Sequence, residues 1–449
     1  MKQYNSQYET MTQAPVSKLV VQLGIPTTIS MLVTSIYNLV DTFFVGQLNS
    51  DSATGAVGVV FSFMAVLQAF GFMFGQGAGS NISRLLGAKD SKRASVFAAT
   101  GFYGSIAMGL LIFLIGSMFK TKLVYLLGST ETIFPYARDY LTNLIWAAPF
   151  VMGSFVLNNI LRFEGKANLS MVGLLSGAFV NMALDPLLIF VFDMGVSGAA
   201  LATGISQTIS FSILLYMFIS GRTQCKLGIV NISKSLADWW NIVATGFPSL
   251  IRQGMGSISS ALLNWQAKIY GDAAVAAMSV VNRIMMFIFS AGLGIGQGFQ
   301  PVCGYNYGAG KYSRVKEACT FTIKLAMGII DVVALLGFIF APGLVAIFRN
   351  DPTVIEIGTV TLRAQCLSVM IVPVMVITNM TLQSTGQKAW ATFTSMLRNG
   401  IYFIPILLLF SHLFGLFGIQ IAQAVAEVLS VITCAPILYN FLRKLPEDA

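Results

Sequence analysis

The residues best suited to chemistry lie inside apolar stretches of the sequence. Asn181, Asp185 and Pro186 fall in an apolar run from Leu169 to Phe192 that is long enough to cross a bilayer. A carboxylate in hydrocarbon loses its hydration and a proline removes a backbone donor, so both are costly there. On a helix, Asn181 and Asp185 lie one turn apart and face the same way. The pair is therefore a candidate functional site.

Two further polar residues extend this candidate site. Asp41 ends the first apolar run, and Thr203 lies about one turn into the sixth. The topology given below places both toward the same outer half of the membrane as Asn181 and Asp185. Carboxylate, amide and hydroxyl oxygens suit a small hard cation such as Na⁺, or a shared proton. The alternatives are that Asp41 is a membrane-edge residue and that Asp185 only supports a helix kinked at Pro186.

The composition is that of a protein with many membrane spans. The 449 residues are 55% hydrophobic and 10% charged, whereas soluble domains carry about 25% charged residues. The net charge of +9 does not indicate nucleic-acid binding, because the positive residues lie in short loops where they orient helices. The five cysteines show no CxxC spacing and there is one histidine, so neither a disulfide framework nor a zinc site is expected.

Hydropathy predicts an all-α polytopic membrane protein with twelve transmembrane helices. Lysine and arginine are concentrated in the segments that share a side with the N-terminus, and the opposite segments hold only Lys120, Lys122 and Arg349. The positive-inside rule therefore predicts that both termini are cytoplasmic. The predicted spans are 19–45, 55–81, 94–118, 136–160, 169–192, 197–219, 240–268, 274–300, 318–348, 355–381, 391–412 and 416–441.

An internal repeat divides these spans into two sets of six. Gly-Gln-Gly occurs at 75–77 and at 296–298, and Pro26 and Pro248 match at nearly the same offset. An even number of spans per copy gives both copies the same orientation, a parallel repeat found in transporters. The predicted domains are a cytoplasmic segment 1–18, an N-lobe 19–219, a cytoplasmic linker 220–238, a C-lobe 239–441 and a cytoplasmic tail 442–449.

A central cavity between the lobes would bind the transported compound. Aromatic rings and methionines suit flat, apolar, cationic ligands. Pro26 and Pro186 are candidate hinges where helices bend. The candidate cavity residues are Tyr37, Phe150, Phe155, Met286, Phe289, Arg283 and Gln297.

The sequence resembles the multidrug and toxic compound extrusion (MATE) transporters over essentially its whole length. The motifs are the Ile25-Pro26 start, SRLLGA at 83–88, LDPLLIF at 184–190, GAALAT at 198–203 and GFQPVCGYNYGA at 298–309. It is most similar to the bacterial and archaeal branch that keeps acids in the first lobe. The resemblance implies antiport by alternating access, with a first-lobe cation site at Asp41, Asn181, Asp185 and Thr203, joined by the carbonyl of Ala199. The sequence lacks the acid in span seven that other members use.

We therefore expect a secondary antiporter, and no enzyme, that exports amphipathic organic cations in exchange for Na⁺ or H⁺. There is no phosphate-binding loop and no catalytic motif, and no cofactor is expected beyond the coupling ion. The expected setting is the bilayer of the cell membrane, with the protein as a monomer and no nucleic-acid partner. Three alternatives remain. A lipid-linked oligosaccharide flippase would use Arg252, Lys268 and Arg283 for phosphates; the other two are an integral membrane transferase and a channel.

Overall fold

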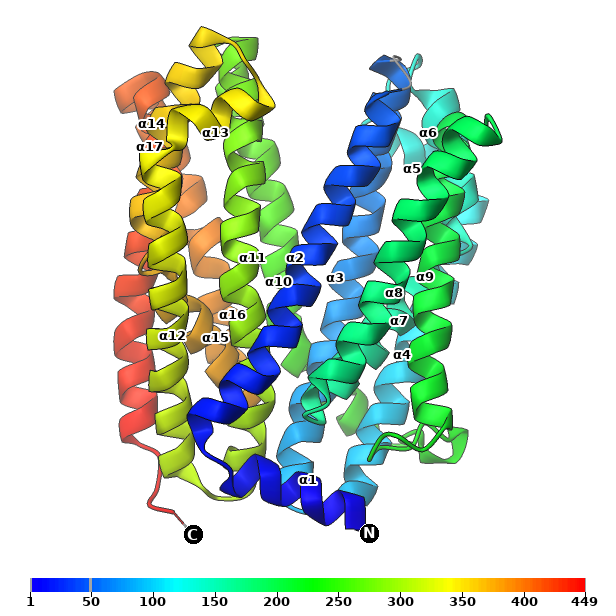
Figure 1. Cartoon of the computed structure of the whole chain (residues 1–449), viewed down its shortest axis with the longest axis vertical. Coiled ribbons are helices and arrows are strands. Elements are labelled where there is room, and N and C mark those ends of the chain that lie inside the picture. Colours follow the sequence, from blue (N-terminus) through cyan, green and yellow to red (C-terminus); the bar gives the residue numbers. More distant parts are fainter. Residues whose placement is uncertain (1, 48–50, 449) are drawn as a thin grey trace. The chain divides into compact units, whose positions relative to one another are not determined.

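The computed structural model describes residues 2–47 and 51–448, which fold into helices and form no strand (Figure 1). Long apolar helices satisfy their own backbone groups, as a hydrocarbon environment requires. In chain order the elements are α1 (Lys2–Gln13), α2 (Val16–Gly46), α3 (Asp51–Gly87), α4 (Ser91–Met118), α5 (Lys120–Leu126), α6 (Phe134–Ile145), α7 (Ala148–Phe163), α8 (Ala167–Pro186), η1 (Leu187–Val191), α9 (Gly195–Ile219), η2 (Ile229–Asn231), α10 (Leu236–Lys268), α11 (Asp272–Gly308), α12 (Tyr312–Ile339), α13 (Ala341–Phe348), α14 (Pro352–Val369), α15 (Val372–Ser384), α16 (Lys388–Met396), η3 (Leu397–Ile401) and α17 (Phe403–Arg443).

These helices follow the predicted spans, but several spans are broken where the sequence predicts continuous helices. The fourth span is the pair α6 and α7, bent by 55°, and the tenth is the pair α14 and α15, bent by 52°. Pro149 and Pro373 each lie in the first turn after the break, where a missing backbone N–H costs nothing. The last two spans run into one another through a kink at Gly415, whose φ of 60° suits glycine.

The N-terminal segment is more ordered than its polar sequence indicates. It forms α1, in which Met11 and Thr12, near the end of the helix, are buried. The Asn306 side chain donates to the Met11 carbonyl at 3.1 Å, and Lys311 donates to the Thr12 carbonyl at 2.9 Å. The end of α1 is therefore anchored to α11 and to the turn that precedes α12.

The chain divides into two compact units, whose borders differ from the predicted lobe borders. The first unit joins the residues up to Tyr8 with Ile29–Leu250, and the second joins Glu9–Thr28 with the chain from Ile251 onward. The first unit therefore contains the beginning of α10, which continues into the second unit. The second unit contains the beginning of α2, which continues into the first. Pro26 and Pro248 both lie two residues before these borders.

The repeated Gly-Gln-Gly motif explains why the starts of α2 and α10 pack in a different unit from the rest of each helix. In the first unit, a methyl group at Gly246 of α10 would lie 1.8 Å from the Met73 carbonyl oxygen of α3, and one at Gly77 would lie 2.0 Å from the Ile242 carbonyl oxygen. In the second unit, a methyl group at Gly298 of α11 would lie 2.4 Å from the Cα atom of Gly24 in α2. The motif glycines thus allow backbone contact between helices. The start of α10 crosses α3 at Gly77, and the start of α2 crosses α11 at Gly298.

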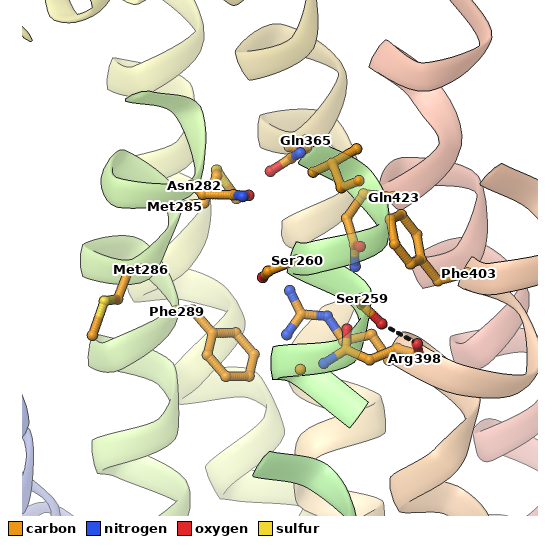
Figure 2. Close-up of a pocket in the computed structure, with 13 residues that line it drawn as sticks. Ser259, Ser260, Asn282, Met285, Met286, Phe289, Gln365, Arg398, Phe403 and Gln423 are labelled. Atoms are coloured by element: carbon orange, nitrogen blue, oxygen red, sulfur yellow. Dashed lines mark hydrogen bonds between the residues drawn. The ribbon is translucent and has the colours of Figure 1, made fainter. Parts of the chain in front are cut away.

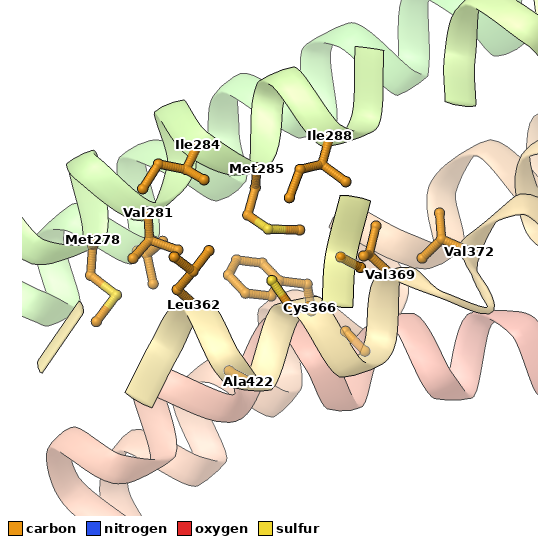
Figure 3. Packing of buried hydrophobic residues seen from close by; sticks show 14 of the residues in the cluster. Met278, Val281, Ile284, Met285, Ile288, Leu362, Cys366, Val369, Val372 and Ala422 are labelled. Carbon is orange, nitrogen blue, oxygen red and sulfur yellow. The ribbon is translucent and has the colours of Figure 1, made fainter. Parts of the chain in front are cut away.

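The core of the second unit is formed by helical stripes of apolar residues. Figure 3 shows side chains of α11 facing those of α14, with α17 behind them. Met278, Val281, Met285 and Ile288 recur at helical spacing along one side of α11 and are buried. This packing holds α11 and α14 at fixed register, so their polar residues also have fixed positions.

In the first unit, α3 packs against α4 and α7, and α8 packs along α9 (Figure 1). The linker that follows α9 is held by Glu164, the residue that caps α7. Its carboxylate accepts from the backbone N–H groups of Gln224 and Cys225 at 2.9 Å each, and Lys166 lies 3.6 Å away. Burial raises the pKa of the Glu164 carboxyl above its usual value.

Candidate functional site

The local structure around Asp185 results from Pro186. Because proline has no N–H, the α-helical pattern of α8 ends there, and the next turn is the π-helix η1. In η1 the Phe192 N–H donates to the Leu187 carbonyl at 3.0 Å, five residues back. Single π turns of this kind are frequent at functional sites. Gly198 of α9 lets the two segments meet, since a methyl group there would lie 2.7 Å from the Leu188 carbonyl oxygen.

Three of the predicted cation-site residues form one hydrogen-bonded group. The Asn181 amide nitrogen donates to Asp185 Oδ1 at 3.3 Å and to Thr203 Oγ1 at 3.4 Å. Their relative exposures are 2% for Asn181, 0% for Asp185 and 7% for Thr203, so water has little access. Asn181 and Asp185 are brought together by helical spacing, and Thr203 by the packing of α9 on α8.

Asp41 joins this group from α2. Its carboxylate is close enough to Asp185 for the two charges to interact. Within the described part of the chain, three buried oxygens here have no hydrogen-bond partner, namely Asp41 Oδ1, Asn181 Oδ1 and Asp185 Oδ2. Buried acceptors without donors are costly. Oxygen atoms of two carboxylates and an amide fit a Na⁺ ion or a proton, either of which would supply the missing positive charge.

Three more residues belong to this cluster, and two of them are absent from the sequence prediction. The Tyr37 hydroxyl is hydrogen-bonded to Gln207, and the ring lies within electrostatic range of both carboxylates. The Tyr140 hydroxyl is hydrogen-bonded to Thr203. Helical spacing points to Tyr37 and Gln207, which lie one turn from Asp41 and Thr203 respectively. Nothing local points to Tyr140, which reaches the cluster through the packing of α6 on α9.

The structure places the other predicted residues at several locations. Ala199 is fully buried on α9, one turn before Thr203. Phe150 packs edge-on against Trp146 and Phe211, and Phe155 packs against Phe72, all within the first unit. In the second unit, Met286 and Phe289 line a hollow, Arg283 is exposed away from it, and Gln297 is buried among glycines of α11.

The acid of the last span has a different environment. Glu427 Oε1 accepts from Arg398 Nε at 3.0 Å and Nη2 at 2.6 Å, and its Oε2 accepts from Ser368 at 2.5 Å. Gln423 also donates to Oε1, at 3.3 Å. Both carboxylate oxygens are therefore satisfied by protein groups. Across the described ranges, no set of three or more histidine, cysteine, aspartate and glutamate side chains could hold a metal ion.

Comparisons with known proteins identify the family of the chain. The MatE family model matches the chain twice, at residues 26–187 and 248–409, so each match begins at one of the repeated prolines. The multidrug export protein MepA of Staphylococcus aureus strain MRSA252 is 30% identical over 97% of this chain and 96% of its own length. The MepA protein of Staphylococcus saprophyticus is 29% identical over the same shares.

A solved structure shows the same fold. It is an outward-facing conformation of a multidrug resistance MATE family transporter of the MOP superfamily, with a TM-score of 0.92 and 26% identity. The alignment covers 97% of this chain and 98% of the other. The prediction of an all-α membrane protein with twelve helices in a two-lobe repeat is confirmed by this likeness.

The apolar helices, the fold and these relatives together define a multi-pass membrane transporter. Within that class, the chain belongs to the MATE family, because the family model matches most of it and the MepA relatives align along nearly its whole length. The resemblance noted in the sequence is therefore confirmed.

Proposed function

We propose that this transporter exports amphipathic organic compounds, among them cations, in exchange for Na⁺ or H⁺ by alternating access. The proposed setting is the cell membrane, with both termini cytoplasmic and the protein working as a monomer. The multidrug export activity named for the MepA relatives supports the class of cargo. The single observation that carries the ion coupling is the group of three unpartnered oxygens on Asp41, Asn181 and Asp185.

The cluster offers a route from ion binding to helix movement. Two nearby carboxylates in a low-dielectric environment repel each other, and a bound cation or proton removes that repulsion. Asp41 lies on α2 beyond Pro26, and Asp185 precedes the π turn at Pro186, so each acid belongs to a helix interrupted by proline. Neutralising the pair would let α2 and α8 pack more closely, which changes the relative stability of two transporter states. Any effect of the ion on drug affinity must then be reciprocal.

Reconstituted transport tests the proposal. Purified protein in liposomes should expel a fluorescent organic cation when a Na⁺ or pH gradient is imposed, and collapse of the gradient should stop the efflux. Asp41→Asn and Asp185→Asn should each abolish the gradient-dependent part while leaving folded protein in the membrane. Asp331→Asn is the matched control, because Asp331 is a span carboxylate of α12 in the other unit. Full gradient-driven efflux by both first-unit variants would refute the proposed site.

The flippase alternative receives less support. Of its three candidate phosphate-binding residues, Arg252 lines a hollow, whereas Lys268 and Arg283 are exposed outside it. That hollow has a volume of about 130 Å³ and adjoins one of about 300 Å³, and the two together match a drug-sized ligand rather than an oligosaccharide.

A further inference from the structure

The second unit contains a hollow that the proposed ion exchange does not use. It has a volume of about 300 Å³ and lies among α10, α11, α14, η3 and α17. Figure 2 shows Met286 and Phe289 on one side and Gln423 and Phe403 on the other, with Ser260 and Arg398 between them. Its lining therefore combines aromatic and methionine side chains with several polar groups, as in sites that bind aromatic molecules with a polar substituent.

Arg398 presents a free donor edge to this hollow. Its Nε and Nη2 donate to Glu427, and its Cζ atom lies 4.3 Å from the centroid of the Phe289 ring. Within the described ranges, Nη1 makes no hydrogen bond, and it is not sealed from solvent. The guanidinium is thus fixed in orientation by its acid and its ring, with unused N–H groups available to a ligand.

A second arginine lies beside it. Arg252 and Arg398 both line a smaller adjoining hollow, which shares Gly256, Phe289 and Asn399 with the larger one. The hydrogen bond of Arg252 is to the Asn379 side-chain oxygen at 3.4 Å, and no carboxylate of the described residues lies within ion-pair distance. The two hollows are therefore lined by two guanidinium groups, and the Glu427 carboxylate, which belongs to neither lining, neutralises only that of Arg398.

This unbalanced charge has an energetic consequence. Arginine keeps its charge at physiological pH, and an uncompensated charge inside membrane-spanning helices is costly. A single anionic group placed between Arg252 and Arg398 would balance the charge. A carboxylate matches best, because it is planar, carries one negative charge and pairs with guanidinium N–H groups in parallel. The rest of such a ligand would lie against Phe289, Met285 and Met286.

We propose that this hollow is a binding site for aromatic molecules that carry a carboxylate. The carboxylate lies between the Nη1 edge of Arg398 and the guanidinium of Arg252, and the ring occupies the larger hollow. This extends the range of cargo beyond the organic cations expected from the sequence, to carboxylates and zwitterions. The proposed carboxylate site is independent of ion coupling. It can therefore be tested by equilibrium binding without any ion gradient.

A matched pair of probes isolates the role of charge. Binding of naphthalene-2-carboxylate and of naphthalene-2-carboxamide to the purified full chain is measured by ligand fluorescence. The carboxylate should bind more tightly than the amide. Arg252→Gln should weaken carboxylate binding by about ten- to a hundredfold, the value of one charge-assisted hydrogen bond, and leave amide binding unchanged. Arg252→Lys should retain part of the preference.

Two further variants keep the test decisive. Arg363→Gln is the control, because Arg363 is an exposed arginine of α14 bonded to the Phe338 carbonyl and lies outside both hollows. Gly256→Leu should block both probes by filling the hollow, and it should fold, since a methyl group at Gly256 makes only an ordinary contact of 3.5 Å with Asn399. Equal binding of the two probes by the unmodified chain, or a carboxylate preference that survives in Arg252→Gln, would overturn the proposal.

Discussion

The two units of this transporter share an architecture but differ in how the acids grouped near their π turns are satisfied. In the first unit, Asp41 and Asp185 each keep a buried oxygen without a partner. In the second unit, both oxygens of Glu427 are bonded to Arg398, Ser368 and Gln423. An acid with free oxygens can accept and release an ion, whereas a saturated acid cannot do so without breaking its protein contacts.

The internal repeat places the two groups of residues on equivalent helices. At the offset that aligns Gly195 with Gly415, Gln207 aligns with Glu427 and Thr203 with Gln423. Both sites adjoin a π turn, η1 in the first unit and η3 in the second. In η3 the π turn carries Arg398 and Asn399, and the Asn399 carbonyl accepts from Ser259. The same local irregularity thus adjoins a buried acid with an unpartnered oxygen in one copy, and carries the arginine of a neutralised pair in the other.

Breaking the Arg398–Glu427 pair should have the largest effect on stability. Arg398→Met leaves a buried carboxylate without its cation and should cost about 3–5 kcal/mol. The double variant Arg398→Met with Glu427→Met should recover most of that loss. Thermal unfolding in detergent measures both. A single variant as stable as the parent would show that Glu427 is not satisfied by Arg398 in solution.

The glycine crossings should be equally sensitive in both units, because their packing is shared. Gly246→Ala and Gly298→Ala each place a methyl group within 2.4 Å of backbone and should destabilise by about 1–3 kcal/mol or prevent folding. Gly254→Ala on the same helix α10 is the control, since nothing lies within 4 Å of its added methyl group. The control should be neutral or stabilising by up to about 1 kcal/mol. Tolerance of alanine at only one crossing would mean that the units do not share this contact.

A smaller effect is expected from Thr203, which orients Asn181. Thr203→Ala removes one acceptor of the Asn181 amide and should weaken ion binding by about fivefold, the value of one net hydrogen bond. Gln423→Ala, at the aligned position of the second unit, should leave ion binding unchanged. Equal losses in the two variants would contradict the assignment of ion exchange to the first unit.

The sequence predicts what depends on local spacing and composition. Helical spacing pairs Asn181 with Asp185, and the repeated Gly-Gln-Gly motif marks equivalent positions in the two copies. Contacts between different spans are not predictable in this way. Arg398 of η3 pairs with Glu427 of α17, and Tyr140 of α6 contacts Thr203 of α9. The π turns are also missed, because they depend on how neighbouring helices take up the hydrogen bonds that proline and close packing leave free.

Ion binding to the purified protein tests the central claim most directly. Equilibrium binding of radioactive Na⁺, with proton uptake or release followed on the same samples, is compared between the unmodified chain, Asp41→Asn, Asp185→Asn and the control Asp331→Asn. Asp331 is a suitable control because it also has a buried oxygen without a partner in the described residues, but lies in the second unit. The account predicts that Na⁺ binding, or the equivalent proton exchange, disappears in both first-unit variants and persists in Asp331→Asn. Binding that persists in both first-unit variants and disappears in Asp331→Asn would contradict it.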